Sequence, residues 1–216
     1  MATHNSFPFF TVIIATYNRA DLITRALNSL AGQSENDWEA IIVDDGSTDN
    51  TYSRLVPFME QNSMIRYSKY AHQGMAMAKN AGMQSASGRY VTFLDSDDEY
   101  HPLHLETRKA ILQEHPGVNF LYGRVKVVGN QFVPDRFDRN KLVNLNNCII
   151  GGNFFIERNT ANMLKGFRNI TIGADADLFD RTKCAGIKMM EVFLPTYIYH
   201  HDNEDSITNR MLIDSD

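Results

Sequence analysis

The sequence predicts an α/β protein in which a mixed, mostly parallel central sheet is flanked by helices. Strand-like and helix-like segments alternate from residue 9 to residue 98, which is the pattern of βαβ units. The strand-like segments are apolar on both faces, as buried parallel strands are. Carboxylates follow two of these strands directly, at the point where a strand must leave the sheet, because a buried strand cannot carry like charges inside itself. We expect one domain over residues 1–216.

The first half of the chain supplies the parallel part of the sheet. After a loose leader, Phe9–Ala15 is continuously apolar and predicts a central strand. Apolar side chains then recur at helical spacing as far as Gly32. The further strands are expected at 38–43, at 65–70 and from Tyr90, and the further helices at about 52–59 and 74–86. Right-handed crossovers between parallel strands bring all their carboxyl ends to one edge of the sheet.

Polar side chains meet at that edge. Tyr17-Asn18 follows the first strand, Asp44-Asp45 follows the second, and Asp95, Asp97 and Asp98 follow the strand that begins at Tyr90. Ligands of open α/β sheets bind at this edge, and converging carboxylates suit a hard divalent cation such as Mg²⁺ or Mn²⁺. Such a cation would neutralise a diphosphate ligand. The alternative is that each acidic turn is solvated and caps the helix after it.

The second half of the chain is less regular. We expect a helix over Leu103–His115 and a strand over Asn119–Val128. Residues 129–147 are polar and predict a variable loop. The remaining expectations are a strand over 148–156 interrupted by Gly151-Gly152, a helix at about 160–165, a loop entering a helix over 173–181, and short strands at 189–193 and 196–201. Histidines 101 and 104 have zinc-like spacing, but without further ligands nearby we expect them on a helix surface.

Composition excludes several classes of protein. A formal net charge of −5 argues against a nucleic-acid partner. The two cysteines, Cys148 and Cys184, are too few for a disulfide framework, so we expect free thiols. We find neither an apolar run of membrane-spanning length nor a signal-peptide pattern. We therefore expect a cytoplasmic protein that contacts the inner face of the cell membrane only peripherally, if its acceptor lies there.

Four stretches taken together resemble glycosyltransferase family 2 with the GT-A fold. They are Thr11–Arg19 (TVIIATYNR), Ile42–Asp49 (IVDDGSTD), Lys79–Gly82 (KNAG) and Gly88–Asp98 (GRYVTFLDSDD). The resemblance is close and in order over residues 9–102, so we expect this half to bind the nucleotide-sugar donor and residues 103–216 to bind the acceptor. It implies transfer of a sugar, here expected to be a hexosyl group, to a hydroxyl with inversion.

The resemblance also implies roles for residues of the first half. Tyr17 would pack on the nucleotide base and Asp45 would hydrogen-bond it. Asp95, the first aspartate of the Asp-x-Asp motif, would lie by the ribose, and Asp97, the second, would bind Mg²⁺ or Mn²⁺. Lys79 stands near the donor, where the family often has arginine. The other expected donor contacts are Ala15, Asn18, Asp44 and Ser96.

In the second half the resemblance is thinner. Family members often carry a Glu-Asp pair followed by Asp-Leu and Arg, the aspartate of the pair being the general base. Here Ala174 replaces the glutamate, and Asp175 takes the base position. The alternative is that Asp175 and Asp177 only cap their helix. Tyr199-His200-His201 resembles the closing segment, where a histidine reaches the metal; we assign His201, although the sequence does not separate it from His200. The alternative is that these residues only end a strand.

The expected function is therefore transfer from a nucleotide-diphosphate sugar, UDP-linked, to a sugar or lipid-linked acceptor in bacterial cell-surface polysaccharide or glycan synthesis. The alternative is a sugar-nucleotide-binding protein of the same fold without transferase activity. That alternative predicts loss of Asp97 and Asp175, and both are present. The chain ends soon after its last motif, so we expect it to lack the C-terminal extension that many relatives carry.

Overall fold

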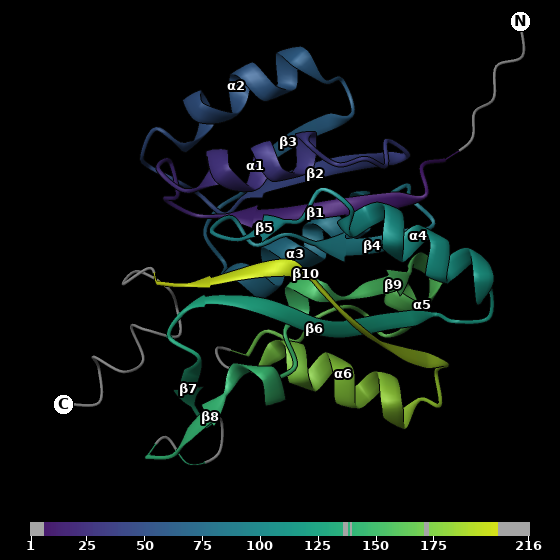
Figure 1. Cartoon of the computed structure of the whole chain (residues 1–216). Coiled ribbons are helices and arrows are strands. Elements are labelled where there is room, and N and C mark those ends of the chain that lie inside the picture. Colours follow the sequence, from purple (N-terminus) through teal and green to yellow (C-terminus); the bar gives the residue numbers. More distant parts are fainter. Residues whose placement is uncertain (1–6, 136–137, 139, 171–172, 203–216) are drawn as a thin grey trace, which may run out of the picture.

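The computed structural model describes residues 7–135, 138, 140–170 and 173–202. Its main feature is an eight-stranded sheet in the order β3-β2-β1-β4-β9-β6-β10-β5, which takes strands from both halves of the chain (Figure 1). The strands are β1 (Phe10–Thr16), β2 (Trp38–Asp44), β3 (Ile65–Lys69), β4 (Tyr90–Phe93), β5 (Glu99–Tyr100), β6 (Phe120–Gly129), β9 (Phe155–Glu157) and β10 (Met189–His201).

The sheet is mixed and mostly parallel, as predicted. Strand β1 is central and pairs in parallel with β2 on one side and β4 on the other. Strand β9 is antiparallel to β4 and to β6, so β4 and β6 run in the same direction. Strand β10 is parallel to β6, and the short edge strand β5 is antiparallel to β10. The carboxyl ends of β1, β2 and β4 consequently share one edge, where the polar motifs lie.

Helices cover both faces of this sheet. Alternate side chains along β1 separate two cores: Val12 and Ile14 belong to one buried cluster and Ile13 belongs to the other. The first cluster packs under α1 (Ile23–Ala31), α2 (Thr51–Gln61) and α4 (His104–Glu114). The second packs under α3 (Met75–Ser85), α5 (Arg158–Met163) and α6 (Ala174–Cys184). Strands that are buried on both faces in this way explain the continuous apolar runs in the sequence.

Two strands expected in the second half differ from the prediction. Residues 148–156 are not one strand: Gly151–Asn153 forms a 3-10 helix, η2, and only the end of the segment enters β9. The glycines there let other groups approach the backbone closely, as the site shows. The two strands expected at 189–201 form the single strand β10, whose register to β6 shifts between Val192 and Tyr197.

The expected irregular loop at 129–147 contains regular structure. A hairpin pairs β7 (Phe132–Pro134) with β8 (Leu142–Asn144), and the 3-10 helix η1 (Leu145–Asn147) follows. His104 is also misassigned to a surface, because its side chain is fully buried and its Nδ1 lies 2.8 Å from Thr196 Oγ1. Burial, with Arg108 nearby, holds the pKa of His104 well below its usual range. Among the described residues, each helix is too short or too polar to span a lipid bilayer.

Candidate active site

An aromatic platform lies where β1 and β2 end. Tyr17 is 41% exposed, and the ring of His72 stacks on it with centroids 4.2 Å apart. Nδ1 of His72 lies 2.8 Å from Oδ2 of Asp45. The Asp45 carboxylate also accepts the backbone N–H groups of Gln73 and Gly74, both at 2.8 Å. Tyr17 and Asp45 are thus brought together through His72, and Asp45 holds the loop that leads into α3.

The turns after β1 and β2 are locked to each other. Asn18 adopts a left-handed conformation, with φ of 50°, and its Oδ1 accepts the N–H of Thr48 at 2.8 Å. Asp44 is completely buried, and its carboxylate accepts bonds from Ser47 N and from the Tyr67 hydroxyl, at 2.7 and 2.8 Å. Asn18 and Asp44 therefore fix the shape of this edge from within. Ala15 lies partly buried on β1 just before the turn.

A buried ion pair joins α3 to the end of β4. Lys79 is 1% exposed and its Nζ lies 2.8 Å from Oδ1 of Asp95. The rings of Phe93 and Phe167 lie 5.6 and 5.7 Å from the same nitrogen. Burial alone would lower the pKa of Lys79, but the carboxylates of Asp95 and Asp175 outweigh it and hold that pKa above its usual value. The lysine is therefore a fixed positive charge between these two acids.

Asp175 completes this cluster from the first turn of α6. The carboxylate lies among Lys79, Asp95 and the backbone of η2, and its Oδ2 accepts the N–H of Gly151 at 3.0 Å. Burial raises the pKa of Asp175, and Asp95 adds to the rise, while Lys79 and the Gly151 bond oppose it. A carboxylate with a raised pKa is a stronger base than an ordinary one. Asp177 instead pairs with Arg168 and Arg181, at 3.0 and 2.8 Å.

Asp97 lies beyond Asp95 on the same strand end, with Ser96 buried between them. Arg25 of α1 donates a hydrogen bond to the Asp97 backbone carbonyl and thereby fixes the turn. Burial raises the pKa of the Asp97 carboxyl, and Asp95 raises it further, against the positive charges of Arg19 and Arg25. Among the residues that the structure describes, no cation forms an ion pair with the Asp97 side chain.

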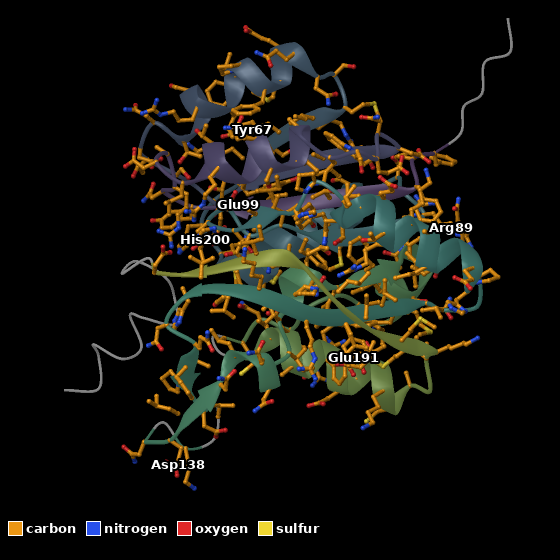
Figure 2. The ribbon with its side chains drawn as sticks, in the orientation of Figure 1. Tyr67, Arg89, Glu99, Asp138, Glu191 and His200 are labelled. Atoms are coloured by element: carbon orange, nitrogen blue, oxygen red, sulfur yellow. The ribbon has the colours of Figure 1, made fainter. Side chains whose placement is uncertain are left out.

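The two histidines at the end of β10 differ in what they contact. His200 Nε2 lies 2.6 Å from Glu99 Oε1 (Figure 2). The backbone N–H of His200 donates to the Asp98 carboxylate. His201 is 2% exposed, and its Nδ1 lies 2.7 Å from the carbonyl of Asn130. Because a carbonyl only accepts, Nδ1 carries a proton, and in the neutral imidazole Nε2 is then the nitrogen with the lone pair. That buried Nε2 has no hydrogen-bond partner within the described part of the chain.

Asp97 and His201 offer the donor types that a divalent cation takes when a ligand completes its coordination. No group of three His, Cys, Asp or Glu side chains converges into a metal cage among the described residues. Mg²⁺ is usually bound through one or two carboxylates together with substrate phosphates. Within the described residues, the Asp97 carboxylate forms no ion pair and Nε2 of His201 has no hydrogen-bond partner, so both belong to the donor types of that limited set. The proton on Nδ1 of His201 is fixed by a backbone carbonyl, as in many metal-binding histidines.

The sequence did not reveal several groups of the site. His72, Gly151 and Arg25 were not identified as site residues, although each contacts one that was. The signal for Gly151 was present, because paired glycines in an apolar run mark a close backbone approach. The third acid after β4, Asp98, is buried and accepts a hydrogen bond from the Tyr197 hydroxyl at 2.7 Å, so it ties this turn to β10.

A family profile described as glycosyl transferase family 2 matches residues 11–185. The β-1,3-glucosyltransferase WfgD of Escherichia coli, which uses UDP-Glc and GlcNAc-diphosphoundecaprenol, is 31% identical over 65% of this chain and 56% of its own. TuaG of Bacillus subtilis, a glycosyltransferase assigned to teichuronic acid biosynthesis, is 37% identical over 50% of this chain and 43% of its own. The chain thus spans about half the length of these relatives.

Two solved structures share the fold at low sequence identity. TarS of S. aureus, crystallised as residues 1–349 with UDP-GlcNAc, superposes with a TM-score of 0.78 at 23% identity, over 92% of this chain and 60% of its own. The mannosyltransferase PcManGT of Pyrobaculum calidifontis, solved with GDP-Man and Mn²⁺, gives 0.68 at 20% identity, over 90% and 57%. Both are GT-A transferases, and the likeness confirms that the sheet described above is the GT-A fold.

Proposed function

The chain belongs to glycosyl transferase family 2, and we propose that it moves a hexosyl group from a UDP-linked sugar to an acceptor hydroxyl with inversion. We place the reaction in bacterial cell-surface polysaccharide or glycan synthesis, because relatives such as WfgD act there on lipid-linked sugars. The observation that carries the proposal is the convergence of Lys79, Asp95 and Asp175 at the carboxyl edge of the sheet. There a basic carboxylate faces a fixed positive charge.

The donor would lie along the edge formed by β1, β2 and β4. The exposed ring of Tyr17 offers a face to the base, and the oxygens of Asp45 retain lone pairs for a base N–H. His72 now covers the Tyr17 ring, so the base either displaces it or stacks beside it. Asp95 would accept from a ribose hydroxyl while the Lys79 ion pair keeps its carboxylate oriented.

Asp175 would act on the acceptor. Its carboxylate takes the proton of the attacking hydroxyl as the oxygen forms a bond to the anomeric carbon. The bond from that carbon to the diphosphate oxygen breaks on the opposite face, so the nucleoside diphosphate leaves and the configuration inverts. Asp97 and His201 would hold Mg²⁺ or Mn²⁺, which neutralises charge on the departing diphosphate when bound. The bond from Gly151 keeps Asp175 pointed at the reacting atoms.

Two measurements on the unaltered chain test this function. Calorimetry with UDP, GDP and ADP, each with and without Mn²⁺, should give the tightest binding for UDP with the metal. An assay of UDP released from UDP-glucose and UDP-N-acetylglucosamine should then detect turnover. Failure of every nucleoside diphosphate to bind would contradict the donor site. Tight UDP binding without release from either sugar nucleotide, even with an added panel of glycoside acceptors, would favour a binding protein without transferase activity.

A further inference from the structure

A hollow lies on the α6 side of the sheet, in the half of the chain that we expect to bind the acceptor. It encloses about 240 Å³ between the middle of β6, the start of β10, helix α6 and the segment from η1 to Ile150. Figure 2 shows Glu191, one of its lining residues, close to α6. The nucleotide platform of Tyr17 and Asp45 contributes nothing to its walls, so this is a separate compartment.

Two of the residues that line the hollow, Ile150 and Phe179, are close in the chain to the proposed base or to its hydrogen-bond partner. Ile150 lines it, and the next residue, Gly151, donates its N–H to Asp175 at 3.0 Å. Phe179 lines it from α6, one helical turn after Asp175. The hollow therefore lies one residue along the chain from the N–H that holds the Asp175 carboxylate, and one helical turn along α6 from Asp175 itself.

The lining combines aromatic faces with hydrogen-bonding groups. The rings of Tyr122 and Phe179 meet edge to face, with centroids 4.9 Å apart. Arg124 and Glu191 bring one charge of each sign, and the side chain of Asn147 adds an amide that can donate and accept. The guanidinium of Arg124 lies over the Phe193 ring at 5.5 Å, which orients it. Burial raises the pKa of Tyr122, and the Glu191 carboxylate raises it further, so the phenol keeps its proton as a donor.

This chemistry suits an uncharged sugar ring. The C–H faces of a pyranose pack on aromatic rings, and its hydroxyls pair with carboxylate, guanidinium and amide groups. Charges of both signs on the walls do not favour a phosphate or a polyanion. We propose that the hollow lined by Tyr122, Arg124, Phe179 and Glu191 binds an uncharged pyranose of the acceptor glycan and presents it to Asp175, an inference that rests on the proposed function.

Direct binding tests this without knowledge of the natural acceptor. The probes are methyl glycosides of glucose, galactose, mannose and N-acetylglucosamine, measured by saturation-transfer NMR on the chain saturated with UDP and Mg²⁺. Asn147→Trp fills the hollow with a large side chain, and Glu191→Gln removes one polar wall. Asn28→Trp is the matched control, because Asn28 is exposed on α1 and lines a different hollow. UDP affinity of each variant is measured by calorimetry.

We expect saturation transfer to at least one glycoside in the unaltered chain. The signal should be lost in Asn147→Trp, weakened at least about threefold in Glu191→Gln and kept in Asn28→Trp. UDP affinity should be the same in all of these proteins. It is overturned if no glycoside binds the UDP-loaded chain, or if the signal survives in Asn147→Trp. Both results leave UDP binding and UDP release intact, so they separate failure of this site from failure of the donor site. Absence of UDP binding in the unaltered chain would instead count against the proposed function and, with it, this inference.

Discussion

At the scale of single residues, Asp97 is the group on which metal dependence rests. Asp97→Asn keeps the size of the side chain but removes the charge that a hard cation needs. We expect the Mg²⁺-dependent part of UDP affinity to fall about 10–100-fold, since even outer-shell changes at metal sites cost that much. Calorimetry with UDP and Mg²⁺ measures this, with Glu60→Gln, at an exposed position on α2, as the charge control. Equal affinity in Asp97→Asn, together with indifference to a chelator, would make the acidic strand end structural.

Gly151 is a second decisive residue, because it has no room for a side chain. A Cβ at this position would lie 2.4 Å from the Asp175 carboxyl. Gly151→Ala should therefore displace the proposed base while leaving the nucleotide platform untouched. Misplacing a reacting group by about 1 Å can cost on the order of 100-fold in rate, and we expect a loss of that order in UDP release with unchanged UDP affinity.

Gly117→Ala is the control for that substitution, since an added Cβ there meets only the flexible end of Lys188, at 3.2 Å. Unchanged UDP release in Gly151→Ala would mean that Asp175 tolerates displacement, and hence that it does not act on the reacting atoms.

At the scale of elements, Glu39 on β2 shows how the parallel strands are tied together. Its buried carboxylate accepts bonds from Thr11 Oγ1 and Ser87 N, both at 2.7 Å, and pairs with Arg66 on β3. Burial alone would raise the pKa of Glu39, but the bonds from Ser87, Thr11 and Arg66 outweigh it and lower that pKa. A lowered pKa in the folded state stabilises the protein above the ordinary value of 4.5, and this stabilisation is lost as pH falls through the lowered value.

Glu39→Gln should therefore lower the free energy of unfolding by roughly 1–2 kcal/mol at pH 7, because bonds to a charged acceptor are replaced by bonds to a neutral one. The difference from the unaltered chain should shrink as pH falls below the ordinary value of 4.5 and through the lowered pKa of Glu39. Urea unfolding at a series of pH values checks this, with Glu114→Gln, exposed at the end of α4, as the control. A difference that stays constant with pH would show that the loss is one of packing and not of charge.

At the scale of the whole molecule, the eight-stranded sheet joins the expected donor half to the expected acceptor half. If these form one domain, as the sequence predicts, unfolding should be a single cooperative transition. The chain has one tryptophan, Trp38 on β2, which reports on the first half, whereas far-ultraviolet circular dichroism reports on all elements. The two thermal transitions should coincide, and UDP with Mg²⁺ should shift both equally. Two separate transitions would divide the chain into two domains.

Much of this architecture is encoded locally, and the missed parts are set by distant contacts. The four strands of the first half and the edge that they share follow from apolar periodicity and from crossover handedness. The strand expected at 148–156 is not formed as one strand. The Tyr197 hydroxyl packs against the backbone of Gly152 and the Asp175 carboxylate against that of Gly151, and both contacts come from residues far along the chain. His72 could not be identified for the same reason, since only folding brings its ring onto Tyr17.

The measurement that tests the central claim most directly compares UDP release by Asp175→Asn and Asp177→Asn across a range of pH. Asp175→Asn cannot accept a proton, and a positioned base contributes ~10²–10⁴-fold, so release should fall by that factor while UDP affinity stays the same. Asp177→Asn alters only the pairs with Arg168 and Arg181 and should keep most activity. The unaltered chain should lose activity at acidic pH, with a midpoint above the ordinary carboxyl range, because burial raises the pKa of Asp175. Near-normal release by Asp175→Asn, or an activity that does not fall at acidic pH, would contradict the assignment of Asp175 as the base.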